Sequence, residues 1–201
     1  MEQTIIEGIE QYGYIAILFF LFLETIFPPI PSEVILLSTG VAVAHTQMTA
    51  PMVIGVSTFG SFLGATLWYI VGRKVPLGKI KSWSTYGFLS KAGVEYDSIL
   101  KGREVFFTKG KWIVFFGRFI PMLRSVISIP AGMAKMNFFT FSLFTLLGSG
   151  VWNGLSIYIG YRAGDSWREL LKFFHYYTEV IVVFGIIVLG GLLVLWKKRR
   201  N

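Results

Sequence analysis

Two arginines lie inside a stretch that is otherwise apolar enough to enter a lipid bilayer. Arg118 and Arg124 both fall within residues 112–133. Placing an arginine at bilayer depth costs about 3 kcal/mol or more, so it is retained for a partner or a task. Pro121 and Pro130 break the segment, and broken helices are tolerated in membranes only where protein or a watery cavity satisfies the freed backbone. We therefore interpret this segment as a cavity-lining re-entrant hairpin whose cations bind an anion or internal carboxylates.

Two carboxylates occupy a second broken segment near the N-terminus. Glu24 and Glu33 flank a cluster of prolines, which cannot lie in the interior of a helix. The apolar run that follows, residues 34–44, is too short for a full crossing. We predict a re-entrant hairpin over residues 24–44. Its hairpin-breaking residues are Pro28, Pro29 and Pro31.

The chemistry follows if the tips of the two hairpins meet. Arg118 and Arg124 are then predicted to bind phosphate, which arginine grips bidentately. Glu24 and Glu33 are predicted to couple transport to protons or to gate the arginines, because burial and a neighbouring arginine act on a carboxylate in opposite directions. The alternative is that the four residues simply pair and hold the hairpins together, although buried pairs often add little net stability.

The composition indicates an integral membrane protein and excludes several kinds of site. The chain has 201 residues, of which 54% are hydrophobic, and its mean hydropathy is +0.62. It has no cysteine, which excludes disulfides and thiolate metal sites. His45 and His175 lack metal-ligand spacing, and no nucleophile–His–acid set occurs. We therefore expect neither an enzyme nor a bound metal or cofactor.

The positive charges are unevenly distributed. Residues 1–72 contain no Lys or Arg, whereas residues 73–111 contain nine, and the chain ends in four cations at 197–200. These blocks flank apolar spans, so the positive-inside rule and anionic lipid headgroups explain them better than nucleic acid does. We expect the C-terminus and the basic segment 73–111 to be cytoplasmic.

The remaining elements form one membrane domain. The basic segment carries apolar residues at three-to-four spacing, which predicts an amphipathic helix on the membrane or an ordinary helix packed on the protein. Residues 3–23 are predicted as a retained helix, because a signal peptide would begin with positive charge. Small residues on the spans permit a homodimer and equally serve internal packing. The segments long enough to cross a bilayer are 52–71, 138–161 and 177–196.

The two hairpins and the spans that follow them form an internal repeat. The hairpins align at an offset of 92 residues and the spans at an offset of 88. Since each module is a hairpin plus one crossing, the second module starts from the opposite face and the repeats are inverted. This arrangement is common in transporters, whose site lies near the membrane midplane. The matched pairs include Pro29 with Pro121, Gly40 with Gly132, Gly60 with Gly148, and Gly72 with Gly160.

Both hairpins resemble the signature segments of the DedA family of small bacterial membrane proteins. The first is Glu24 followed by Pro-Pro-Ile-Pro-Ser-Glu at 28–33. The second is Phe-Gly-Arg-Phe-Ile-Pro-Met-Leu-Arg at 116–124, with Pro-Ala-Gly at 130–132. Many relatives have Gly-Asp or Gly-Glu where this chain has Ser32-Glu33, so Glu33 matches less directly. By motif, the family's two functional acids and two arginines fall on Glu24, Glu33, Arg118 and Arg124.

The resemblance implies inverted re-entrant hairpins and movement of phospholipids across the cytoplasmic membrane. We therefore expect an all-α integral membrane protein of the bacterial inner membrane that carries a lipid phosphate. Undecaprenyl phosphate is the leading cargo, and phosphatidylethanolamine is the alternative. Two other hypotheses stay open, namely a proton- or cation-coupled antiporter that affects lipids indirectly, and a membrane scaffold without transport.

Overall fold

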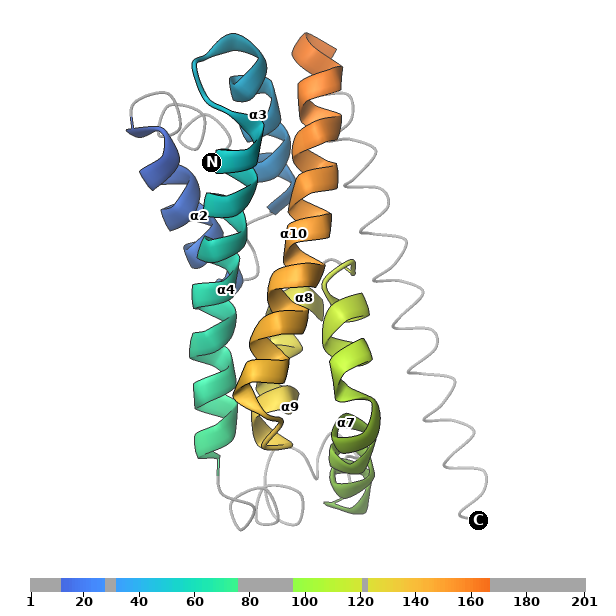
Figure 1. The fold of residues 1–201 in the computed structure, drawn as a ribbon. Helices are drawn as coiled ribbons and strands as arrows, with labels where there is room; N and C mark the ends of the chain where they lie inside the picture. The colour runs from blue at the N-terminus through green and yellow to red at the C-terminus, as the bar shows by residue number, and fades with distance from the viewer. Residues whose placement is uncertain (1–11, 28–31, 76–95, 121–122, 167–201) are drawn as a thin grey trace.

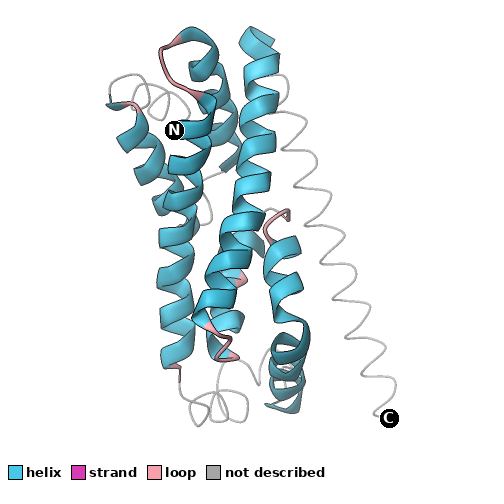
Figure 2. Cartoon of the chain, viewed as in Figure 1, coloured by secondary structure: helices cyan, strands magenta, loops and turns pink. Residues whose placement is uncertain are grey.

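The computed structural model describes residues 12–27, 32–75, 96–120 and 123–166, and these form helices and short turns without a strand among them (Figures 1 and 2). Two long helices, α4 (Ala50–Lys74) and α10 (Phe138–Ala163), pack against each other at the centre. Both are long and apolar enough to cross a membrane, as predicted. The third predicted span, residues 177–196, lies outside the described residues.

Two shorter helices occupy the end of the molecule where α4 begins. In Figure 1, α2 (Tyr14–Ile26) runs from this end to the middle and α3 (Ser32–His45) returns to it. Helix α2 packs mainly on α4, and α3 packs mainly on α10. Helix α2 continues past residue 23, where we expected it to end, so Glu24 lies in its last turn. The prolines at 28, 29 and 31 lie outside the described residues.

The opposite end has a similar pair of arms. Helix α7 (Tyr96–Gly117) rises to the middle, and α8 (Leu123–Val126) and α9 (Ser128–Met133) lead back to this end (Figure 1). The short helix η1 (Gly164–Ser166) follows the last residue of α10. Helix α7 joins part of the predicted amphipathic segment and the first arm of the second hairpin in one helix.

Pro130 accounts for the break between α8 and α9. It has no N–H to donate to the carbonyl of Val126, four residues earlier, so the helical ladder is interrupted there. Helix α9 begins at Ser128, one residue after the break, and contains Pro130. The other predicted breaker of this hairpin, Pro121, lies outside the described residues.

Glycines bring the short helices against the long ones. Gly40 of α3 lies against the backbone of α10, and Gly132 of α9 lies against the backbone of α4; a Cβ at either position would collide with that backbone. The reciprocal contacts come from Gly160 of α10 and Gly72 of α4. These four glycines are the ones that the sequence alignment matches, Gly40 with Gly132 and Gly72 with Gly160. Helix α3 therefore packs closely on α10, and α9 packs closely on α4, at glycine positions.

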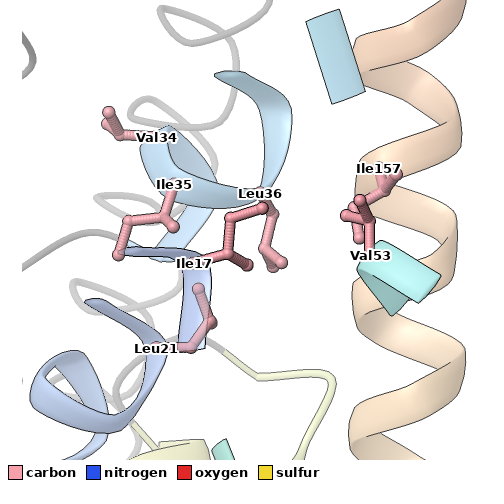
Figure 3. Packing of buried hydrophobic residues seen from close by; sticks show 7 residues of the cluster. All are labelled: Ile17, Leu21, Val34, Ile35, Leu36, Val53 and Ile157. Atoms are coloured by element: carbon pink, nitrogen blue, oxygen red, sulfur yellow. The ribbon is translucent and has the colours of Figure 1, made fainter. Parts of the chain in front are cut away.

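Two apolar clusters enclose a polar middle. One cluster joins α2, α3, α4 and α10, and the other joins α4, α7, α9 and α10. On both long helices, buried serine, threonine and asparagine lie between them in the chain. The first cluster, drawn in Figure 3, is Ile17, Leu21, Val34, Ile35, Leu36, Val53 and Ile157, and the second is Ala65, Tyr69, Val114, Ala131, Met136 and Phe141.

Candidate functional site

A buried ion pair joins the two broken segments at the middle of the molecule. Arg124 Nη2 of α8 lies 3.2 Å from Glu24 Oε2 of α2, and the two side chains are 3% and 4% exposed. One hundred residues separate them in the sequence. A pair this deeply buried repays its desolvation only when further hydrogen bonds satisfy the remaining polar atoms.

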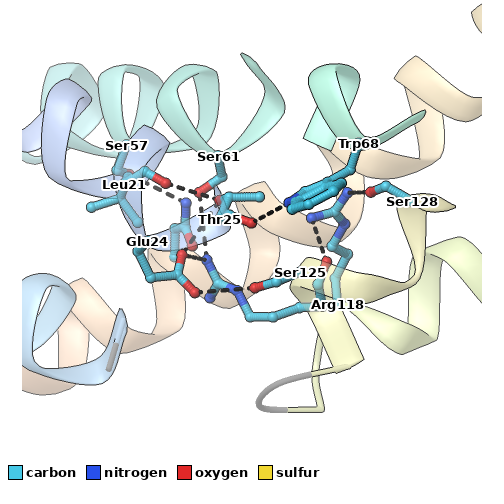
Figure 4. A network of polar contacts seen from close by, with 11 residues as sticks. Leu21, Glu24, Thr25, Ser57, Ser61, Trp68, Arg118, Ser125 and Ser128 are labelled. Carbon is cyan, nitrogen blue, oxygen red and sulfur yellow. Dashed lines mark hydrogen bonds and ion pairs between the residues drawn. The ribbon is translucent and has the colours of Figure 1, made fainter. Parts of the chain in front are cut away.

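Hydroxyl groups from three helices surround this pair. Ser125 donates to Glu24 Oε1 at 3.4 Å, and the Thr25 hydroxyl lies 3.4 Å from Glu24 Oε2. Ser61 of α4 accepts from Arg124 Nη2 at 3.5 Å. The indole N–H of Trp68 donates to the backbone carbonyl of Thr25 at 3.0 Å, which fixes the last turn of α2 against α4. Figure 4 shows these groups converging from separate helices.

Arg118 is buried in a different environment. It is 1% exposed and donates to the backbone carbonyl of Arg124 at 2.9 Å, to Ser128 at 3.2 Å and to Thr145 at 3.5 Å (Figure 4 shows the first two bonds). No carboxylate among the described residues forms an ion pair with it. The guanidinium therefore ties α8, α9 and α10 together through neutral oxygens, and its charge is not neutralised by an adjacent acid.

Glu33 lies in the first turn of α3, where the helix dipole favours a negative charge. It is 7% exposed and close enough to Glu24 for the two charges to repel each other. Its Oε1 is buried and has no hydrogen-bond partner within the described part of the chain. The same holds for Arg118 Nε and Arg124 Nη1. The site thus has unused donors and an unused acceptor, which a bound group could satisfy.

The structure brings together three of the four predicted site residues by direct contact. Glu24 bonds to Arg124, and Arg118 bonds to the Arg124 backbone, whereas Glu33 is near them without a hydrogen bond in the described residues. Among those residues, no three His, Cys, Asp or Glu side chains gather as a metal ion would require.

The polar partners were missed by sequence reasoning, which assigned the small residues of the spans to helix packing. A signal for them exists, because they recur at a spacing of four residues along one face of each long helix. They are Ser57 and Ser61 of α4, and Thr145, Ser149 and Asn153 of α10.

The chain matches the VTT domain over residues 30–162. It is 37% identical over 201 residues to the alkaline phosphatase-like protein of Lactococcus lactis subsp. cremoris, covering 99% of this chain and 94% of the relative. It is 32% identical over 206 residues to undecaprenyl phosphate transporter A of Staphylococcus aureus, covering 100% and 99%. The Bacillus subtilis protein of the same name is 29% identical over 196 residues, covering 97% and 93%. No solved structure gives a significant match.

These matches agree with the motifs and the site. The VTT domain match contains Glu33, Arg118 and Arg124, and the relatives extend the similarity through Glu24 over nearly the whole chain. With its all-helical fold and two apolar helices long enough to span a membrane, the chain belongs to the VTT domain family, the DedA family of membrane proteins.

Proposed function

We propose that this protein carries a phosphate-bearing lipid across the cytoplasmic membrane, with undecaprenyl phosphate as the leading cargo. The observation that carries the proposal is a buried pair of arginines with unused N–H groups, set between two apolar clusters. Arginine donors in a dry site are complementary to phosphate oxygens. Relatives named undecaprenyl phosphate transporter A support a lipid phosphate as the cargo.

We assign different tasks to the charged residues. Arg124 would exchange its Glu24 partner for the phosphate, since the two anions compete for one guanidinium. Protonation of Glu24 would release Arg124 and thereby couple transport to protons. Glu33 would serve as the second acid, because its negative charge repels that of Glu24 and favours protonation of one of the two. Arg118 would hold the α8–α9 turn in place through its terminal nitrogens and offer its unpartnered Nε–H to the phosphate.

We further infer that the two broken segments are re-entrant hairpins of an inverted repeat. The support is the reciprocal packing of Gly40 on α10 and Gly132 on α4. In the expected orientation, the end with Arg73 and Lys74 faces the cytoplasm, as does the C-terminus. The α2–α3 hairpin then enters from outside, and the α7–α9 hairpin enters from the cytoplasm. Both tips would meet near the midplane, where transporters of this design bind their substrates.

The test is headgroup translocation by the purified protein in proteoliposomes. Arg124→Ala removes the proposed phosphate ligand, and Arg118→Lys replaces a planar fork that bridges two oxygens with a single ammonium. Hydrogen bonds to charged groups are worth about 1.5–3 kcal/mol, so each variant should slow transport of undecaprenyl phosphate roughly ten- to hundredfold.

Arg162→Ala is the matched control, because Arg162 is an exposed cation at the end of α10. It should transport at the rate of the unmodified protein. Unimpaired transport by both site variants, with each confirmed as folded, would overturn the role given to the arginines. Phosphatidylethanolamine in the same vesicles tests the alternative cargo.

A further inference from the structure

A seam of buried polar side chains lies between the two long helices and ends at the arginines. Its members are at most 2% exposed, and their four-residue spacing places them on facing stripes of α4 and α10. At one end, Arg118 reaches Thr145 and Arg124 reaches Ser61, each at 3.5 Å. The members are Ser57 and Ser61 on α4 (Figure 4), and Thr145, Ser149 and Asn153 on α10.

Asn153 closes the other end of the seam, and the hydrogen bonds fix the orientation of its amide. The hydroxyl of Ser57 donates its one hydrogen to the backbone carbonyl of Ile54 at 3.0 Å. The Ser57 oxygen can then only accept, and it accepts from Asn153 Nδ2 at 3.5 Å. Asn153 Oδ1 therefore faces away from Ser57. It is buried and has no partner within the described residues, and the same is true of the Ser149 hydroxyl.

A hydrogen bond between the helices accounts for the amide nitrogen of Asn153 but not for its amide oxygen. The bond from Asn153 to Ser57 joins α10 to α4, as polar residues between membrane helices commonly do. It does not account for an acceptor that is fully buried and unsatisfied, which is costly at a position where an apolar side chain would pack. A donor group that enters the seam would satisfy this oxygen.

The spacing of the seam fits a phosphate. Ser57 and Ser61 are four residues apart, so their contacts to Asn153 and Arg124 are separated by about 6 Å along α4. A phosphate hydrogen-bonded at opposite oxygens spans roughly 8 Å from donor to acceptor. Arg124 and Asn153 thus contact neighbouring turns of α4, and each has an unpartnered polar atom, Nη1 and Oδ1, at a separation that suits the two sides of one phosphate.

The two ends of the seam offer opposite chemistry. Arginine N–H groups take the charged oxygens of any phosphate ester. The Asn153 oxygen accepts a hydrogen bond. Among the oxygens of a phosphate, only a protonated P–OH group can donate one. A singly protonated phosphomonoester carries a P–OH, whereas a phosphodiester has none. Glu33 Oε1 is a second unpartnered acceptor, but its negative charge repels the phosphate, so the neutral amide suits the task better.

We propose that Asn153 is a specificity-determining residue that selects a protonated phosphomonoester over a phosphodiester by accepting a hydrogen bond from its P–OH group. This assignment rests on the proposed function, in which the arginines bind the phosphate. Ser57 positions Asn153 by holding its amide nitrogen. The ligand can be a lipid phosphomonoester or free inorganic phosphate, since each carries a P–OH group.

The test compares the binding of two lipids to the full-length protein in nanodiscs. Asn153→Leu keeps the side-chain size and removes the acceptor, and Asn153→Ala is the second variant if the first fails to fold. Affinity for undecaprenyl phosphate should fall about tenfold or more, while affinity for phosphatidylcholine, a phosphodiester whose headgroup has no hydrogen-bond donor, should change less than about threefold. Ser57→Ala should give a smaller loss in the same direction. Thr39→Val is the matched control, because among the described residues this buried hydroxyl bonds to the carbonyl of Ile35, within α3.

The ratio of the affinities for the two lipids decides whether Asn153 has the proposed role. An equal loss for both lipids, or no loss for undecaprenyl phosphate, overturns the role of Asn153. Competition by inorganic phosphate distinguishes the sources: displacement of the lipid at comparable concentration identifies free phosphate as the ligand, and its failure to displace identifies the lipid. If Arg124→Ala and Arg118→Lys leave both lipids bound at full affinity, the proposed function fails, whatever Asn153→Leu does.

Discussion

At the scale of single residues, the two arginines are not equivalent. Arg124 is neutralised by Glu24 at 3.2 Å, whereas Arg118 is held by a backbone carbonyl and two hydroxyls. Binding an anion at Arg124 therefore requires Glu24 to leave or to be protonated. Arg118 gives up no ionic partner among the described residues, and its bond to the Arg124 carbonyl closes the turn between them. The acid next to Arg124 is thus expected to set both the stability of the site and its access to ligand.

Glu24→Gln tests this difference. The amide keeps the shape of the side chain but leaves the buried Arg124 cation without its counter-charge, so the free energy of unfolding should fall by about 3 kcal/mol. Undecaprenyl phosphate should then stabilise the variant more than the unmodified protein, because a ligand anion replaces the missing charge. Thermal unfolding with and without the lipid measures both effects.

Glu104→Gln serves as the control for Glu24→Gln, because Glu104 is an exposed acid on α7. It should change neither quantity. A lipid-free Glu24→Gln protein as stable as the unmodified one would show that the ion pair carries no stability. Equal stabilisation of the two proteins by the lipid would show that Glu24 does not compete with the phosphate.

At the scale of elements, glycine decides which helices meet. Gly72 of α4 touches the backbone of Ile129, and Gly160 of α10 touches the backbone of Leu37. Contacts this close exclude any side chain from the helix interface, as is usual for small residues between membrane helices. They hold α9 on α4 and α3 on α10, and Glu33 lies in the first turn of α3.

Gly72→Ala should therefore destabilise the protein by about 1–3 kcal/mol, because the new methyl group overpacks the α4–α9 interface. Gly55→Ala is a control on the same helix, where a Cβ meets nothing within 4 Å. That variant should be neutral or up to about 1 kcal/mol more stable, since alanine favours the helix. Thermal unfolding in detergent measures both.

Gly160→Ala tests whether the proposed second module packs in the same way as the first. If the two modules are equivalent, it should destabilise the protein by an amount similar to Gly72→Ala. A large loss in one variant with none in the other would contradict equivalent packing of the two modules.

At the scale of the whole molecule, the positive charges indicate an orientation in the membrane. This orientation can be tested by labelling the two ends of one predicted span. Helix α4 begins at Ala50 and ends at Arg73-Lys74, so its two ends should lie on opposite sides of the membrane, with the basic end in the cytoplasm. The sequence contains no cysteine, and single introduced cysteines can therefore be labelled without background.

Gln47→Cys and Lys74→Cys place thiols at the two ends of α4, at positions that are exposed in the fold. A membrane-impermeant thiol reagent applied to intact cells should label residue 47 and should label residue 74 only after the membrane is opened. Labelling of both from outside would contradict α4 as a span. The opposite pattern would reverse the proposed orientation.

The sequence by itself determined the class of the protein, two segments apolar enough to span a membrane, and the four charged residues that we propose as the site. These features depend on local properties of the sequence. Hydropathy determines which segments can cross a bilayer, and proline determines where a helix breaks. An arginine in an apolar segment is recognisable because burying its charge is costly. The glycine matches were also visible in the sequence, and all four positions, Gly40, Gly72, Gly132 and Gly160, lie against the backbone of another helix.

Only the tertiary structure decided which partners these residues have. That Glu24 pairs with Arg124 rather than Arg118, and that Asn153 leaves an oxygen unsatisfied, depends on how helices separated by about a hundred residues rotate against each other. A hydrogen bond is satisfied over a few tenths of an ångström, and hydropathy and residue spacing specify a helix face only to within tens of degrees. Close packing at the glycines supplies the missing precision, because backbone contact fixes both the distance and the rotation of each helix pair.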